Sequence, residues 1–181
     1  MKNNKIRRIN LWGGPCTGKS TISTWLFSQL KMKDCNIEYV SEYIKFWTYV
    51  PRVPNSWDSL YCQAKQIHKE DTLLRNDEID IIISDSPVPL QCYYAYHHSN
   101  PGKEHMLGIS REFEDMYPSI NIFLERNDEH YKEIGRYENL KEAKIIDNEI
   151  LDFLKCNEIE YTKYPVVNKE EILNYILKEI K

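Results

Sequence analysis

The sequence predicts an α/β fold, in which helices cover the faces of a parallel β-sheet. Apolar runs of strand length alternate along the chain with longer segments of helical periodicity, which is the pattern typical of such sheets. The run IDIIIS at residues 79–84 consists mostly of isoleucine, as expected of a central strand that is buried on both faces. With 181 residues the chain is long enough for one core, and we expect residues 1–181 to form a single domain.

Three strands and two helices are predicted in the first half of the chain. The strands are expected over residues 5–12, 37–41 and 79–84. A helix is expected over residues 21–31, because its apolar residues recur at the spacing of one buried helix face. A second helix is expected from Trp57 onward. Six residues at helical spacing define the face that we expect to pack on the sheet: Trp57, Leu60, Ala64, Ile67, Asp71 and Leu74.

The second half of the chain predicts two further strands and two further helices. The strands are expected over residues 119–124 and 158–164, and the helices over residues 139–154 and 169–180. Residues 99–105 (SNPGKEH) have the strongest helix-breaking composition in the chain. They predict a surface connection between two helices.

Composition and charge exclude several classes of protein. The formal net charge is -4 and the mean hydropathy is -0.61. No apolar stretch reaches the roughly 18 residues of a membrane span, so we expect no membrane partner and a cytoplasmic location. The negative charge disfavours nucleic acid as a partner, because non-specific affinity comes from Lys and Arg that neutralise phosphates, although a local basic groove stays open. The cysteines are odd in number and widely spaced, which favours reduced thiols: Cys16, Cys35, Cys62, Cys92 and Cys156.

The sequence GGPCTGKS at residues 13–20 matches the phosphate-binding motif G-x-x-x-x-G-K-[ST] in full. It lies between the first predicted strand and the first predicted helix, which is the context that this motif requires. Its backbone N–H groups and the helix N-terminus are expected to bind the phosphates of ATP. Lys19 is expected to reach the β- and γ-phosphate oxygens, and Ser20 to ligate Mg²⁺. The residues expected to contact the nucleotide are Gly13, Gly14, Pro15, Cys16, Thr17, Gly18, Lys19, Ser20 and Thr21.

Two acidic residues directly follow predicted strands. Glu42 follows the second strand and Asp85 the third. Because ligands of open α/β sheets bind outside the carboxyl ends of the strands, both are expected to face the phosphate-binding loop. We expect Asp85 to hold Mg²⁺ directly or through water. Glu42 is expected to accept the proton of an attacking hydroxyl or to bind a substrate sugar, and an exchange of roles between the two carboxylates stays open.

A polar stretch after the fourth predicted strand predicts a lid over about residues 126–138. Arg126 and Arg136 are expected to stabilise negative charge on the migrating phosphoryl group. Lys132 lies between them, and Gly135 could act as a hinge when the segment closes on ATP.

Five aromatic residues lie between the second predicted strand and the following helix, beside the expected acceptor site. Most are expected in the core, and one or two are expected to stack on a nucleobase. They are Tyr43, Phe46, Trp47, Trp57 and Tyr61. The five histidines show no spacing with cysteines or carboxylates that would specify a metal.

Four segments together resemble a group of small P-loop kinases: GGPCTGKST, VSEYIKFW, IISDSP and FLERNDEHYKEIGRYE. The group contains nicotinamide-riboside-kinase-like domains and many phage-encoded nucleotide kinases grouped under an AAA label, and the likeness covers most of the chain. It implies a P-loop NTPase fold with a five-stranded parallel sheet in the order 2-3-1-4-5. It also implies acidic positions near acceptor and Mg²⁺ for Glu42 and Asp85, and lid positions for Arg126 and Arg136. The implied function is phosphoryl transfer from ATP, with Mg²⁺, to a hydroxyl or phosphate of a nucleoside-like or nucleotide-like acceptor.

Other functions stay open beside this one. The resemblance also admits a kinase of DNA ends or of hydroxymethylated bases in DNA. A nucleotide-gated ATPase or binding protein also fits, because the motif reports binding and not the fate of the γ-phosphate. A GTPase is disfavoured: NKEE at residues 168–171 departs from N-K-x-D in its last position, and Asn168 with Glu171 is better explained as the cap and third residue of the final helix. A motor-type AAA ATPase would need a helical lid domain, for which the chain is too short after the sheet.

Overall fold

The computed structural model of the protein describes residues 6–50, 52, 54–128 and 138–180. A five-stranded sheet has the order β2-β3-β1-β4-β5, and all four pairings of neighbouring strands are parallel. This confirms the predicted α/β fold class and the strand order that the resemblance to small P-loop kinases implies. The strands are β1 (Arg8–Trp12), β2 (Ile37–Val40), β3 (Ile81–Ser84), β4 (Ser119–Glu125) and β5 (Thr162–Pro165).

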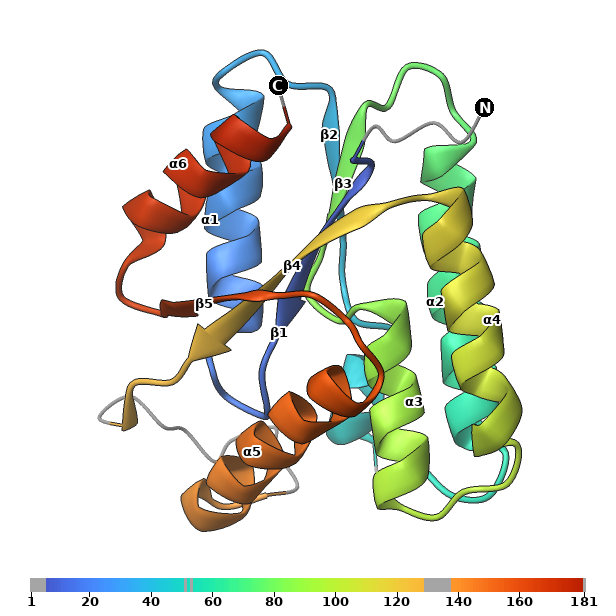
Figure 1. Ribbon diagram of the computed structural model, residues 1–181. Coiled ribbons are helices and arrows are strands. Elements are labelled where there is room, and N and C mark those ends of the chain that lie inside the picture. Colours follow the sequence, from blue (N-terminus) through green and yellow to red (C-terminus); the bar gives the residue numbers. More distant parts are fainter. Residues whose placement is uncertain (1–5, 51, 53, 129–137, 181) are drawn as a thin grey trace.

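Helices cover both faces of this sheet (Figure 1). They are α1 (Lys19–Lys31), α2 (Asp58–Leu74), α3 (Val88–His97), α4 (Lys103–Met116), α5 (Leu140–Cys156) and α6 (Lys169–Glu179), together with the 3₁₀ helix η1 (Ile44–Tyr49). The α1 and α6 helices lie on one side, where Ile9 and Leu11 of β1 belong to the main core cluster. On the other side, α3 and α5 pack on Trp12. In the part of the chain that the structure describes, every helix is too short or too polar for a membrane span.

Several element boundaries differ from those predicted, because local turns end the regular structure. The last strand begins at Thr162 instead of residue 158, since Glu158 has a positive φ of 56° and the N–H of Ile159 closes the end of α5 on Leu154. The β3 strand begins at Ile81 because a turn joins the N–H of Ile79 to Asn76. The connection predicted at residues 99–105 lies between α3 and α4, but its last three residues belong to α4.

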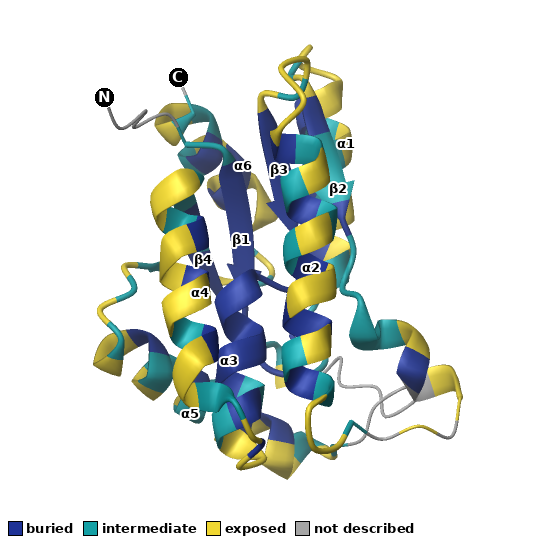
Figure 2. Ribbon diagram, turned by 90° about the vertical axis from the view of Figure 1, so that its right-hand side faces the viewer, coloured by how far each residue is buried: buried dark blue, intermediate teal, exposed yellow. Residues whose placement is uncertain are grey.

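The buried face of α2 is mostly polar, so the predicted apolar face is only partly confirmed. Leu60, Ile67 and Leu74 pack on core clusters as predicted, but the other predicted residues do not form the buried face. The buried residues are Ser59, Cys62, Gln63, Gln66, Glu70 and Leu74, whereas Trp57 is 58% exposed and Ala64 is also exposed. The reason lies in β1, whose Arg8 is fully buried and donates to Glu70 of α2. Figure 2 shows that the β1 strand is buried. A buried guanidinium needs a charged partner, and Glu70 supplies it at 3.3 Å. Gln66 and Ser84 complete the network by donating to the other carboxylate oxygen of Glu70, at 3.0 and 2.9 Å.

Loss of the Glu70 charge is expected to destabilise the fold. The Glu70→Gln variant keeps the shape of the side chain but leaves Arg8 with Glu114 as its remaining carboxylate partner. Removal of one partner from a buried ion pair costs on the order of 3 kcal/mol. Urea unfolding should show this loss, while Glu112→Gln on the exposed face of α4 should change stability by less than about 0.5 kcal/mol. Equal stabilities of the two variants would contradict a structural role for this network.

Candidate active site

The phosphate-binding motif forms the connection between β1 and α1, at the carboxyl end of the central strand (Figure 1). Three of its residues have a positive φ: Gly13 at 145°, Cys16 at 57° and Gly18 at 90°. A Cβ on Gly13 would lie 2.7 Å from the Thr17 Oγ1, so this turn requires glycine. The loop therefore curls back on itself as a phosphate cradle does.

The α1 helix begins at Lys19, two residues earlier than predicted, because Gly18 in the left-handed conformation serves as its N-cap. Lys19 and Ser20 consequently belong to the first turn, whose N–H groups have no partner within the helix and carry partial positive charge. The Lys19 Nζ donates to the carbonyl oxygens of Gly13 at 2.7 Å and Gly14 at 2.8 Å. The ammonium group thus lies directly over the loop in which phosphates would bind.

The structure brings Glu42 and Asp85 together at the carboxyl ends of β2 and β3. Asp85 is 2% exposed, and its Oδ1 accepts the N–H of Glu42 at 2.7 Å. Its Oδ2 accepts the Tyr39 hydroxyl at 2.8 Å. Burial and the nearby Asp85 raise the pKa of Tyr39, so this hydroxyl stays protonated and keeps donating. The carboxylate of Glu42 accepts from the Ser86 Oγ at 3.4 Å.

Two lysines near the loop and the strand ends were not predicted. Lys45 of η1 lies with its Nζ 3.5 Å from the Ser20 Oγ. Lys69 of α2 donates to the Ser41 carbonyl at 2.6 Å and so holds the end of β2 directly before Glu42. Burial lowers the pKa of Lys69, against the opposing effect of the carboxylates of Asp85, Glu70 and Glu42.

Arg126 lies against the phosphate-binding loop. Its side chain is 6% exposed, its Nε donates to Asp147 at 2.5 Å, and its Nη2 donates to the Pro15 carbonyl at 2.9 Å. Asp147, which was not predicted, also accepts the Gly14 N–H at 2.7 Å. The sequence could have indicated it, because Asp147 lies on the same face of α5 as the buried residues Ala143 and Ile150. The predictions for Lys132, Gly135 and Arg136, and most of the predicted lid, lie outside the described residues.

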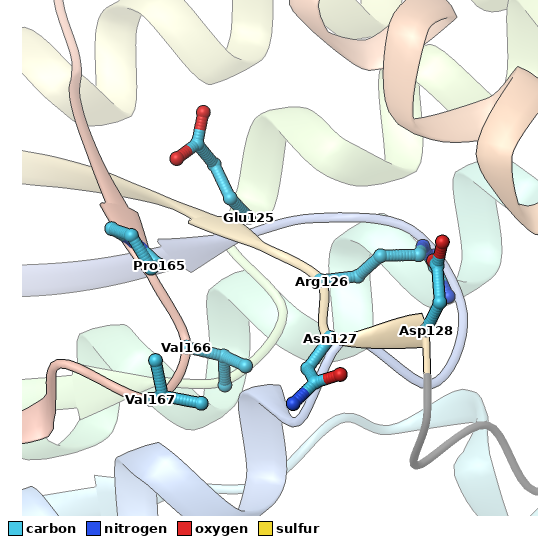
Figure 3. A pocket seen from close by; sticks show the side chains of 7 residues that line it. All are labelled: Glu125, Arg126, Asn127, Asp128, Pro165, Val166 and Val167. Carbon is cyan, nitrogen blue, oxygen red and sulfur yellow. The ribbon is translucent and has the colours of Figure 1, made fainter.

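A cavity of about 390 Å³ opens where β4 and β5 end, beside the loop. Figure 3 shows the side chains from the two segments that line it: Glu125, Arg126, Asn127, Asp128, Pro165, Val166 and Val167. Val166 also contacts the phosphate-binding loop, since a Cβ on Gly18 would lie 2.9 Å from its Cγ2. The cavity and the Glu42–Asp85 pair therefore lie on opposite sides of the loop, because β1 separates β4 and β5 from β2 and β3.

Three of the five predicted aromatic residues form a cluster near Glu42. The Tyr43 and Tyr61 hydroxyls are 2.9 Å apart, and the Trp47 ring stacks on Tyr61 with centroids 6.4 Å apart. The Arg52 guanidinium lies 3.5 Å above the Trp47 ring. The expectation that most of the five lie in the core is wrong, since Trp47 is the one buried member. The others are half-buried or exposed, with Phe46 at 73% and Trp57 at 58%.

The donor atoms of the site suit a hard cation, which prefers oxygen ligands. Ser20 supplies a hydroxyl, and Glu42 and Asp85 supply carboxylates at the neighbouring strand ends. Across the described part of the chain, His, Cys, Asp and Glu side chains form no group of three arranged to hold a metal by themselves. A Mg²⁺ ion here would therefore need the phosphates or water for its remaining ligands, as Mg²⁺ usually does.

Comparison with known proteins places the chain in a family. The family model AAA_28, described as an AAA domain, matches residues 8–171. No curated protein matches the chain in sequence. Among solved structures, the NadR protein in complex with NAD and AMP-PNP superposes with a TM-score of 0.75 at 11% identity, over 97% of this chain and 49% of that chain. This chain thus spans about half the length of NadR.

Two similar structures match over nearly their whole length. Thymidylate kinase from Ehrlichia chaffeensis gives a TM-score of 0.63 at 14% identity, with 96% of this chain and 99% of that chain covered. YorR from Bacillus subtilis, in complex with phosphorylated GDP, gives 0.61 at 15% identity, with 94% of each chain covered. At these identities the likeness shows the fold. The chain belongs to this AAA domain family, and its fold is that of the small P-loop nucleoside and nucleotide kinases.

Proposed function

We propose that the protein transfers the γ-phosphoryl group of ATP, with Mg²⁺, to a hydroxyl or phosphate of a nucleoside-like or nucleotide-like acceptor. The observation that carries this proposal is the position of the phosphate-binding loop between two sites. A cavity lies on its β4–β5 side, and a pair of carboxylates lies on its β2–β3 side. A transferase needs this arrangement, because donor and acceptor must meet at the γ-phosphate.

The cavity at β4 and β5 suits the base of the donor nucleotide. Its volume of about 390 Å³ is within the usual range of ligand pockets. Val166 and Val167 offer apolar contact with a ring, and Asn127 offers an amide for base edges. The contact of Val166 with Gly18 places this pocket next to the phosphate cradle. AMP-PNP in the NadR structure supports an adenine nucleotide as the donor.

The cluster of Tyr43, Trp47 and Tyr61 suits the acceptor. Flat aromatic surfaces recognise nucleobases by stacking. Tyr43 directly follows Glu42, and Trp47 of η1 and Tyr61 of α2 pack against the Tyr43 ring. Glu42 would accept the proton of the attacking hydroxyl or orient the acceptor sugar. The names of NadR with NR, thymidylate kinase and YorR support an acceptor of the nucleoside or nucleotide class.

Lys19, Ser20 and Asp85 would stabilise the charge that develops during phosphoryl transfer. Lys19 would exchange the Gly13 and Gly14 carbonyls for β- and γ-phosphate oxygens, which compete well because they are charged. Ser20 and Asp85 would hold Mg²⁺, with Asp85 acting through water because both its oxygens already accept hydrogen bonds. When bound, Mg²⁺ neutralises charge that develops on the phosphoryl oxygens. Arg126 and Arg136 remain candidates for stabilising the same charge.

Phosphoryl transfer to a panel of acceptors tests the proposal. ATP labelled in the γ-phosphate is expected to label one member of a panel of nucleosides, nucleoside monophosphates and nicotinamide riboside, and EDTA is expected to abolish the labelling. Label confined to 5′-hydroxyl oligonucleotides or hydroxymethylated DNA would instead identify a DNA kinase. Label found only in free phosphate, or none released, would contradict a kinase and favour a nucleotide-gated ATPase or binding protein.

A further inference from the structure

We propose that Asp147 and Arg126 are a positioning pair that holds the entrance of the phosphate-binding loop in the shape that binds a nucleotide. The inference rests on the proposed function, since it assigns roles within the donor site. It concerns two residues that come from different elements. Arg126 follows β4 directly, and Asp147 lies in the second turn of α5.

The pair is joined to the loop by hydrogen bonds at two successive residues. Asp147 uses Oδ1 to accept the Gly14 N–H at 2.7 Å and Oδ2 to accept the Arg126 Nε at 2.5 Å. Arg126 then donates from Nη2 to the Pro15 carbonyl at 2.9 Å. A closed ring of contacts thus runs from Gly14 through both side chains to Pro15.

The Gly14 N–H needs a partner from outside the loop. Gly14 is buried, and a buried N–H without an acceptor is costly. Pro15 has no N–H, so the Gly14 donor is the last one before the turn that curls around the phosphates. Helix α5 approaches Gly14 so closely that a Cβ there would lie 2.6 Å from the Asp147 Oδ1. A side chain at the second residue of the motif would therefore clash with this carboxylate.

The charges of the pair make the arrangement compatible with anion binding. The Arg126 and Asp147 side chains are 6% and 14% exposed, so water screens them weakly. An unpaired carboxylate at this place would repel the phosphates of a bound nucleotide. Arg126 neutralises Asp147, and in this way it acts on the nucleotide through Asp147.

This electrostatic argument predicts an asymmetry between the two single variants. Arg126→Met leaves a buried negative charge beside the phosphates, and ADP binding is expected to weaken by about tenfold or more. Asp147→Asn keeps an oxygen that can accept the Gly14 N–H, and it leaves a positive charge near the phosphates. The loss of ADP affinity in this variant is therefore expected to be smaller. The double variant removes both charges, and it is expected to bind ADP more tightly than Arg126→Met does.

Calorimetric titration with ADP and Mg²⁺ tests these expectations on the wild-type protein and the three variants. The thermal midpoint without nucleotide is measured in parallel, because a loss of folding alone would lower midpoint and affinity together. Arg111→Met on α4 and Asp152→Asn on α5 are matched exposed controls, and both are expected to bind ADP as the wild type does.

Three results would contradict the proposal that Asp147 and Arg126 position the loop. The first is a double variant that binds ADP no better than Arg126→Met. The second is unchanged ADP affinity with reduced turnover in Arg126→Met, which would place Arg126 on the phosphoryl group itself. The third is absence of ADP binding to the wild-type protein, which would also overturn the proposed function. Normal ADP binding with the expected asymmetry, but no acceptor labelled, would contradict the proposed kinase alone.

Discussion

Replacement of Lys19 by alanine is expected to reduce phosphoryl transfer by on the order of 10²- to 10³-fold, the typical effect of removing one preorganised donor to a developing negative charge. The Lys19 ammonium lies over the loop, held by two carbonyl oxygens at 2.7 and 2.8 Å. A bound triphosphate would offer charged oxygens in place of these carbonyls. The ammonium would then lie where charge accumulates as the γ-phosphoryl group leaves.

The measurement is turnover at saturating ATP with the acceptor that the panel identifies. Because Lys19→Ala also removes two contacts within the loop, Lys19→Met provides a second variant that keeps most of the apolar stem. Lys178→Ala, near the end of α6, is the control and is expected to retain wild-type turnover. Near-normal turnover in both Lys19 variants, with folding intact, would show that this loop is not the catalytic centre.

The sequence was sufficient for those parts of the protein in which local pattern and packing agree. The strand β3 was predictable because it is a nearly continuous apolar run, and β1 and β4 because apolar residues are dense within segments of strand length. The motif could be recognised because its glycines and Lys19 are fixed by the geometry of the loop. The positions of Glu42 and Asp85 could be predicted because the carboxyl ends of parallel strands lie at the same edge of the sheet, where ligands bind.

The remainder depended on contacts between segments that are far apart in the chain. The α2 helix buries Gln66 and Glu70 because Arg8, 62 residues from Glu70, points toward it, and no pattern within the helix reports this. Arg126 was predicted as a lid residue from its place in a polar stretch. Its actual partner, Asp147, lies 21 residues further along and belongs to another helix.

Glu42 and Asp85 are expected to respond differently to removal of their charges, because the structure gives them different partners. Glu42→Gln should lower turnover by about 10²- to 10⁴-fold, the usual contribution of a general base, and should leave ATP binding and stability close to those of the wild type. Asp85→Asn should lower stability as well as turnover. Asp85 is buried and orients both Glu42, through its N–H, and Tyr39, through its hydroxyl.

The Tyr39→Phe variant separates the two contacts of Asp85, one with the Glu42 N–H and one with the Tyr39 hydroxyl. It removes the hydroxyl that donates to Asp85 at 2.8 Å but leaves the contact with the Glu42 N–H in place. If Glu42 is the base, Tyr39→Phe should have a small effect on turnover, because the position of Glu42 is kept. The reverse pattern would be an active Glu42→Gln variant beside a stable but inactive Asp85→Asn variant. It would exclude Glu42 as the base and would leave Asp85 as the carboxylate on which turnover depends.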